Sequence, residues 1–189
     1  MDILQKSKNN QRRIGLTGGI ASGKTTITNY IRKHKNIPIL DADNLSRELI
    51  KPNTYGYKKI LDYFGNKIID NKNNSEREIN RKLLRNIIFK HSASKEWIEK
   101  LLHPLIKEKM IEECSQYRNH QTIVLVIPLL FEAKFEDICT EIWLVKCPKE
   151  LQKKRLIERD KISEKEAYES INLQLSFEEK RKFSDIILD

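Results

Sequence analysis

Cysteine and histidine are scarce in this sequence of 189 residues. The three cysteines, Cys114, Cys139 and Cys147, are odd in number and form no CxxC pair, and the four histidines show no HExxH or other paired metal-ligand spacing. A disulfide scaffold needs paired cysteines, and a structural zinc site needs clustered ligands. The sequence therefore excludes both classes, and we expect reduced, mostly buried thiols.

Long apolar runs are also missing. No stretch approaches the ~18 apolar residues of a membrane-spanning helix, and residues 1–13 lack the apolar core of a secretory signal. These absences favour a cytoplasmic protein with no membrane partner. With 39% apolar and 33% charged residues, the composition is that of a globular protein of one domain.

Positive charge exceeds negative charge, with 36 Lys and Arg against 27 Asp and Glu and a formal net charge of +9. This excess favours an anionic partner, either nucleic acid or a phosphorylated small molecule. A bias of base composition toward Lys, Asn and Ile codons explains the excess equally well.

Short apolar segments alternate with helical patterns along the chain. The expected strands are residues 13–17, 37–40, 122–127, 141–145 and 185–188. Strands that alternate with helices predict an α/β fold, here a five-stranded parallel sheet with helices on both faces.

The segment between the second and third expected strands is long and only helical in pattern. Its roughly 75 residues exceed one crossover helix, so residues 44–117 are predicted to form an inserted helical subdomain within a single domain, 1–189. Residues 12–43 and 118–189 then form the nucleotide-binding core, and 1–11 a disordered N-terminal extension. Because Pro104 suits a first helical turn, we expect one helix to end near Leu102 and another to begin at Pro104.

Residues 18–25, GGIASGKT, match the phosphate-binding motif GxxxxGK[ST] between an expected strand and an expected helix. Backbone N–H groups in such a loop surround phosphate oxygens, the lysine reaches the β- and γ-phosphates, and the Thr25 hydroxyl is placed to bind Mg²⁺. The motif predicts ATP-type binding with Mg²⁺ by Gly18, Gly19, Ala21, Ser22, Gly23, Lys24, Thr25 and Thr26.

The motif alone leaves the phosphate acceptor open. Residues 62–65 match the DxxG motif of regulatory GTPases, but they lie at the end of an amphipathic helix, and residues 66–69 lack the Asp of the GTPase motif NKxD. The third expected strand ends without the Asp that is usual in nucleic-acid motors. A small-molecule kinase is the class that remains.

Two carboxylates, Asp41 and Asp43, follow the second expected strand. Ligands of open α/β sheets bind at the carboxyl ends of the strands, so a carboxylate there could take a proton from an attacking hydroxyl and help to hold Mg²⁺. The alternative is a helix cap, which we favour for Asp41, whereas Asp43 is the predicted functional carboxylate.

Several ordered segments resemble dephospho-coenzyme A kinases. They are residues 14–24, Asp41–Asp43 with Arg47, Arg81 with Leu84, residues 102–106 and 127–132, Arg155 with Arg159 and Asp160, and Gln174 with Glu179 and Lys180. Ala21 stands where glycine is more usual in that family, and the chain ends at Asp189, before the family's usual adenine-contacting loop and final helix.

The resemblance implies transfer of the ATP γ-phosphate to the ribose 3′-hydroxyl of dephospho-coenzyme A, in the fold of nucleoside-monophosphate kinases. It implies Asp43 as the base, Lys24, Arg155 and Arg159 as catalytic cations, and a helical lid at about 149–175. The implied substrate residues are Asp43, Arg47, Arg81, His103, Pro128 and Glu132. Mg²⁺ would be held by Thr25 and Asp43.

Simpler interpretations stay open for some of these residues. His103 could cap a helix or bond a backbone carbonyl, Glu132 could be a solvated loop carboxylate, and the two lid arginines could belong to a solvated helical face. The partners we expect are ATP and dephospho-coenzyme A, without specific nucleic acid, in a monomer or weak oligomer. The alternatives are another small-molecule kinase, of nucleoside or shikimate type, and a basic nucleotide-dependent nucleic-acid-binding protein.

Overall fold

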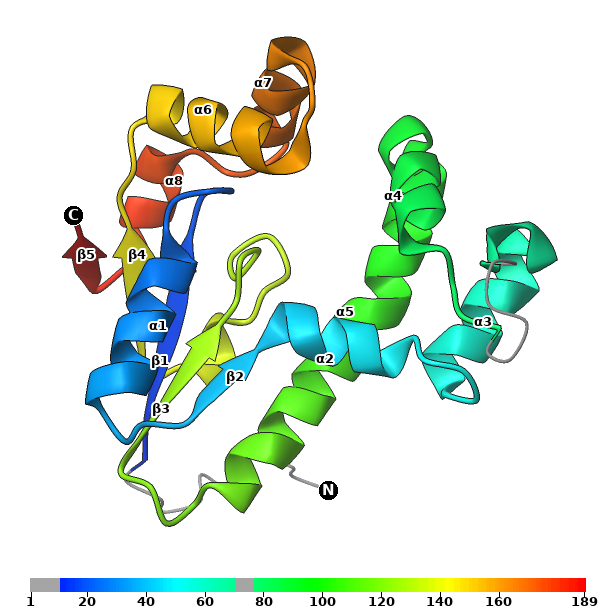
Figure 1. Cartoon of the computed structure of the whole chain (residues 1–189). Coiled ribbons are helices and arrows are strands. Elements are labelled where there is room, and N and C mark those ends of the chain that lie inside the picture. The colour runs from blue at the N-terminus through cyan, green and yellow to red at the C-terminus, as the bar shows by residue number, and fades with distance from the viewer. Residues whose placement is uncertain (1–10, 71–76) are drawn as a thin grey trace. The chain divides into compact units, whose positions relative to one another are not determined.

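Five parallel strands form one sheet in the computed structural model, which describes residues 11–70 and 77–189 (Figure 1). The strands are β1 (Arg12–Gly18), β2 (Ile39–Asp41), β3 (Thr122–Val126), β4 (Glu141–Val145) and β5 (Ile186–Leu188). Their order is β2-β3-β1-β4-β5, and every neighbouring pair is parallel. The predicted five-stranded parallel sheet is therefore confirmed.

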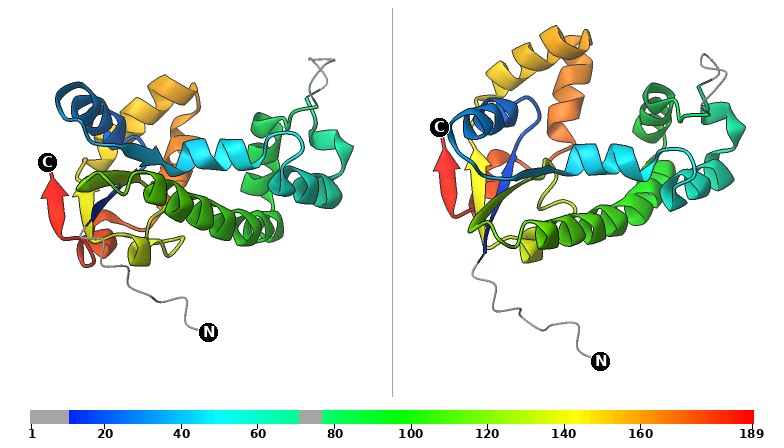
Figure 2. Two further views of the ribbon diagram at one scale, coloured as in Figure 1. Left: turned by 90° about the horizontal axis from the view of Figure 1, so that it is seen from below. Right: turned by 60° about the horizontal axis from the view of Figure 1, so that its bottom comes forward.

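One face of the sheet is covered by α1 (Lys24–His34). Ile27 and Ile31 of this helix join the cluster of Ile14, Val124 and Val145 from the strands. On the opposite face, Leu130 and Cys139 lie against Gly15 of β1. Figures 1 and 2 show α8 (Phe177–Arg181) on that side as well. Helices thus cover both faces, as predicted.

The stretch 149–182, whose sequence is helical throughout, forms three helices. They are α6 (Lys149–Asp160), α7 (Glu164–Asn172) and α8. Leu156 of α6 packs with Ala167 and Ile171 of α7 in a small apolar cluster. Lys161 ends α6 in the left-handed conformation, with φ 54°, and Ser163 with Glu166 forms a capping box that starts α7.

The chain divides into two compact units, residues 1–41 with 112–189, which we call the sheet unit, and residues 42–111, which we call the helical unit. The helical unit contains α2 (Ala42–Leu49), α3 (Tyr55–Phe64), the short 3-10 helix η1 (Asn66–Ile68), α4 (Arg81–Lys90) and most of α5 (Ser92–Gln116), drawn from cyan to green in Figure 2. Tyr57, Ile60, Phe64, Leu84 and Ile98 belong to its core. Residues 71–76 lie outside the described residues.

The predicted break at Pro104 is wrong, because α5 runs through it from Ser92 to Gln116. A proline inside a helix lacks one N–H and crowds the preceding turn, at a cost of about 3 kcal/mol. Ile98, Ile106, Met110 and Cys114 are buried along this helix, and burial of one such side chain contributes about 1.5–3 kcal/mol. The burial of these side chains therefore outweighs the cost of placing Pro104 inside the helix.

The predicted disorder of residues 1–11 falls on positions 1–10, which lie outside the described residues, and on Gln11, where it is wrong. The Gln11 side chain is buried, and its Nε2 donates hydrogen bonds to the carbonyl oxygens of Tyr117 (2.8 Å) and His120 (3.0 Å). The three cysteines are free thiols, as expected, although only Cys114 is buried. Within the described residues, no helix is long and apolar enough to cross a membrane.

Candidate active site

The loop at residues 18–25 joins β1 to α1 in a conformation that depends on its glycines. Gly23 has φ 103°, a value that side chains rarely tolerate. A Cβ on Gly18 would lie 2.8 Å from Ser22 Oγ and 3.0 Å from the carbonyl oxygen of Val145. On Gly19 it would collide with the side chain of Gln152. At each of these three glycines, a side chain would therefore be sterically unfavourable in this fold.

Ala21 is the one residue of the loop that adopts a left-handed conformation without being glycine, with φ 56°. This geometry explains why glycine would suit the position, since the left-handed region costs an L-residue about 1–2 kcal/mol. The loop thus keeps its shape despite a local strain.

Lys24 lies across the loop and donates from Nζ to the carbonyl oxygens of Gly18 (2.8 Å) and Gly19 (2.9 Å). Its ammonium group is therefore held at the loop that would bind a phosphate. Thr25 and Thr26 are exposed in the first turn of α1, where the helix dipole favours an anion.

A cavity of about 720 Å³ lies beside the loop in the sheet unit. Loop residues Ser22 and Gly23, together with Thr26, form part of its wall, and Ile27, Trp143 and Pro148 contribute apolar surface. Cavities of this size and mixed lining hold small organic ligands. Ser22 Oγ is buried there without a hydrogen-bond partner among the described residues.

The two arginines assigned to the lid have different surroundings. Arg155 Nη1 donates to the carbonyl oxygen of Ala21 at 3.3 Å, and Arg155 also lines the cavity. Arg159 donates from Nε and Nη2 to the carboxylate of Asp160, at 2.7 and 3.0 Å. The structure therefore shows Arg155 in contact with the loop and Arg159 paired with Asp160.

Asp41 is the last residue of β2 and lies opposite Val126 of β3, at the carboxyl edge of the sheet. The helix α2 begins at the next residue, so Asp43 occupies its first turn, where it is exposed. Pro128 follows β3 at the same edge, and its carbonyl oxygen accepts a hydrogen bond from Thr17 Oγ1 (3.3 Å).

A second cavity, of about 170 Å³, lies within the helical unit. Arg47, Lys51 and Arg81 line it, with Glu78 as its acidic member. The sequence singled out both arginines but missed Lys51, which stands four residues beyond Arg47 on the sequence. This cationic pocket, defined by Arg47, Lys51 and Arg81, can bind an anionic group.

His103 lies within α5 and is half-buried. Loss of solvent around the ring lowers its pKa, while the nearby charge of Glu99 opposes that shift. A lowered pKa favours the neutral imidazole, which can both donate and accept a hydrogen bond.

Glu132 has protein partners for one of its carboxylate oxygens. Its Oε1 accepts a hydrogen bond from the backbone N–H of Leu175 (3.0 Å) and lies 2.9 Å from Lys180 Nζ. The approach of Lys180 is an ion pair whose angles fall short of hydrogen-bond geometry. Lys180 is almost completely buried, so the sheet unit itself uses the charge of Glu132.

Known proteins resemble the chain over nearly all of its length. The model of the family described as dephospho-CoA kinase matches residues 12–189. The dephospho-CoA kinase of Prochlorococcus marinus strain MIT 9312 is 90% identical over the whole chain, which covers 92% of that protein. The dephospho-CoA kinase of a Synechocystis strain is 38% identical over 95% of the chain and 87% of its own length.

Solved structures agree with these sequence matches. A Thermus thermophilus protein, TT1252, has a TM-score of 0.78 at 27% identity, with 94% of this chain and 87% of that one covered. The dephospho-CoA kinase of Campylobacter jejuni has a TM-score of 0.64 at 29% identity, with coverages of 93% and 86%. The expected family and enzyme class are confirmed: the chain belongs to the dephospho-CoA kinase family, a family of ATP-dependent kinases.

Proposed function

We propose that this chain transfers the γ-phosphate of ATP to the ribose 3′-hydroxyl of dephospho-CoA, the last step of coenzyme A biosynthesis. The observation that carries the proposal is the conformation of residues 18–25, a glycine-dependent loop with a lysine held across it, in a chain that the family model matches over residues 12–189. We further propose that the enzyme acts in the cytoplasm as a monomer or weak oligomer, without specific nucleic acid.

In this proposal the ATP phosphates are bound by backbone N–H groups of the loop and of the first turn of α1, and by Lys24. The Lys24 ammonium already lies at the loop, so it needs only to exchange carbonyl oxygens for phosphate oxygens. The adenosine part of ATP occupies the 720 Å³ cavity, whose apolar side chains suit a planar base. Arg155, which bonds the loop at Ala21, supplies positive charge as the phosphoryl group moves.

The acceptor hydroxyl is activated by Asp43. A ribose hydroxyl is a poor nucleophile, and a carboxylate at the carboxyl edge of the sheet can accept its proton as the bond to phosphorus forms. Asp43 is suited to this because it is exposed in the first turn of α2, directly after β2. Asp41 instead ends the strand and pairs in register with β3.

The residues available for a metal ion fit Mg²⁺. The Thr25 hydroxyl and the Asp43 carboxylate are both exposed oxygen donors, and oxygen is the ligand that Mg²⁺ prefers. No group of three or more His, Cys, Asp or Glu that could hold a metal lies within residues 11–70 and 77–189. Thr25 and Asp43 would leave most ligand positions of the ion to ATP and water, and the bound ion would neutralise phosphate charge.

Dephospho-CoA carries phosphate groups, and the cationic pocket of Arg47, Lys51 and Arg81 is where we place one of its anionic parts. His103 and the Pro128 turn remain proposed substrate contacts. Glu132 also remains a proposed substrate contact, through Oε2, because Leu175 and Lys180 contact its Oε1.

The test is a screen of ADP release with dephospho-CoA, several nucleosides and shikimate as acceptors, followed by location of the phosphate on the product. We expect turnover with dephospho-CoA alone and phosphate on the ribose 3′-oxygen. Faster turnover with shikimate or a nucleoside would contradict dephospho-CoA as the acceptor.

The net charge of +9 keeps a nucleic-acid-binding protein as the second candidate. A duplex-binding titration across salt distinguishes it, because a kinase should bind only weakly and lose that binding steeply as salt rises.

A further inference from the structure

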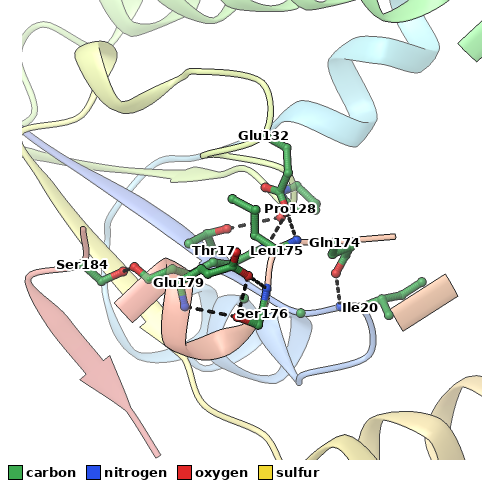
Figure 3. Close-up of polar contacts among 12 residues, drawn as sticks. Thr17, Ile20, Pro128, Glu132, Gln174, Leu175, Ser176, Glu179 and Ser184 are labelled. Carbon is green, nitrogen blue, oxygen red and sulfur yellow. Dashed lines mark hydrogen bonds and ion pairs between the residues drawn. The ribbon is translucent and has the colours of Figure 1, made fainter. Parts of the chain in front are cut away.

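Gln174 contacts the phosphate-binding loop from outside, and the mechanism above does not use this residue. The backbone N–H of Ile20 donates a hydrogen bond to Oε1 of Gln174 at 2.8 Å, across 154 residues of sequence (Figure 3). Ile20 is the third residue of the loop, next to the strained Ala21. The contact therefore acts at the part of the loop where the backbone conformation is most costly.

Packing supports this side of the loop only in part: Ile20 and Ala21 pack against the apolar cluster of α6 and α7. A cavity of about 330 Å³ lies behind the loop, and Gly19, Gln152 and Gln174 are among the residues that line this space. Because interior packing normally fixes a backbone, a loop beside a cavity depends more on its hydrogen bonds. Gln174 lines this cavity, and its side chain accepts the hydrogen bond from Ile20.

The segment that carries Gln174 is itself anchored. Gln174 lies between α7 and α8, and its neighbour Leu175 donates its N–H to Glu132 Oε1, as Figure 3 shows. The same oxygen pairs with the buried Lys180. Ser176 and Glu179 form the capping box of α8: Ser176 N–H donates to Glu179 Oε2 (2.8 Å), and the backbone N–H of Glu179 donates to Ser176 Oγ (3.3 Å).

We propose that Gln174 is a positioning residue for ATP, resting on the proposed function of the loop. Its side-chain oxygen holds Ile20 so that the strained loop keeps the phosphate-binding conformation before ATP arrives, and the Glu132–Lys180 pair holds the Gln174 segment in place. Without this bond, ATP must order the loop as it binds, so affinity for the nucleotide falls. Once bound, the phosphates themselves hold the loop, and the chemical step is little affected.

The test replaces Gln174 with Met, which has similar length and no acceptor oxygen. The matched control is Gln11→Met, which removes two hydrogen bonds at the start of β1, away from the loop sequence. The measurements are the Kd of ADP by calorimetry, the KM of each substrate, kcat and the melting temperature.

For Gln174→Met we expect the Kd of ADP and the KM of ATP to rise about fivefold to tenfold. The KM of dephospho-CoA should stay within about twofold and kcat within about threefold of wild type. For Gln11→Met we expect a fall of about 4–8 °C in melting temperature and an unchanged Kd of ADP.

Three outcomes would overturn the inference. If Gln174→Met binds ADP as tightly as wild type, Gln174 does not position the loop, and the proposed function is untouched. If both variants weaken ADP binding equally, the effect is general destabilisation. If wild type itself binds no ADP, the proposed function fails and this inference fails with it.

Discussion

The phosphate-binding loop and the cationic pocket of the helical unit present positive charge to a ligand by different means. The loop uses backbone N–H groups, three glycines and one lysine whose position is fixed by two loop carbonyls. The pocket uses the long side chains of Arg47, Lys51 and Arg81, of which both arginines are exposed. A site made of backbone admits few residue types, whereas one made of flexible side chains tolerates many.

The energetic consequences differ in the same way. A preorganised backbone site loses little entropy when an anion binds, but an exposed arginine must be ordered and competes with solvent and salt. Substitutions in the loop should therefore act on turnover by large factors, and substitutions in the pocket should act on acceptor affinity by small ones.

Lys24→Ala should produce the largest effect. It removes the lysine ammonium group that lies across the loop, and loss of such a group from a phosphate site costs about 10²–10³ in kcat. The melting temperature should change by no more than about 2–4 °C, since two hydrogen bonds at a partly exposed site are lost. Turnover and thermal unfolding measured together check this, with Lys33→Ala on the same helix as the control. Activity within about threefold of wild type would contradict the loop assignment.

Asp43→Asn should follow, with a loss of about 10² in kcat. The substitution keeps the shape but removes the proton acceptor, and general-base help is worth about 10²–10⁴ in rate. The KM of dephospho-CoA should change far less. Asp41→Asn is the control two residues away, and its expected cost is at most about 1 kcal/mol of stability with little change in kcat. If Asp41→Asn abolishes turnover and Asp43→Asn does not, the base is Asp41.

Arg155→Ala and Arg159→Ala test whether contact with the loop decides a lid arginine's role. Arg155 bonds Ala21, whereas the described partner of Arg159 is Asp160. We expect kcat to fall about tenfold for Arg155→Ala and by less than about twofold for Arg159→Ala, because Arg155 supplies charge at the loop whereas the charge of Arg159 is paired with the Asp160 carboxylate. The Kd of ADP should move less than kcat. An equal loss of kcat in the two variants would mean that both arginines have the same role and that contact with the loop does not decide it.

Arg81→Ala tests the pocket of the helical unit. The loss of one exposed, charge-assisted contact should raise the KM of dephospho-CoA about fivefold, or about 1 kcal/mol, and leave the KM of ATP unchanged. Lys82→Ala removes the neighbouring exposed charge, which does not line the pocket, and should change neither constant. The increase should shrink as salt rises, since salt screens exposed charges. If Arg81→Ala raised the KM of ATP more than the KM of dephospho-CoA, the pocket would not be a binding site for the acceptor.

The same contrast between backbone and side chains explains what the sequence could predict. The strand–loop–helix unit around residues 18–25 was predictable because a spacing of glycines and one lysine encodes a backbone conformation. Apolar periodicity likewise indicates helices at residues 24–34 and 55–64, where the structure has α1 and α3.

The sequence could not predict features that depend on packing at long range. Pro104 signals a helix start locally, and only the burial of residues along α5 shows that the helix continues. Lys51 joins the cationic pocket through the fold of the helical unit, and its spacing carries no motif. The Glu132–Lys180 pair links positions 48 apart in sequence, so neither residue revealed its partner.

Ala21→Gly should have the smallest effect and makes the contrast sharpest, because the same change of residue should act with opposite signs in the two units. Alanine at φ 56° costs about 1–2 kcal/mol in the folded loop, and glycine removes that cost while adding about 0.5–1 kcal/mol of unfolded-state entropy. The net result is about 0.5 kcal/mol of stabilisation, or a rise of roughly 1–2 °C in melting temperature. Ala93 is exposed near the start of α5. Ala93→Gly relieves no left-handed strain but still increases the entropy of the unfolded chain, so it should lower the melting temperature by a similar amount. Both variants should keep kcat within about twofold of wild type, and thermal unfolding measured side by side with turnover checks both. A fall for Ala21→Gly that matches the fall for Ala93→Gly would mean that the loop does not hold Ala21 in the left-handed conformation in solution.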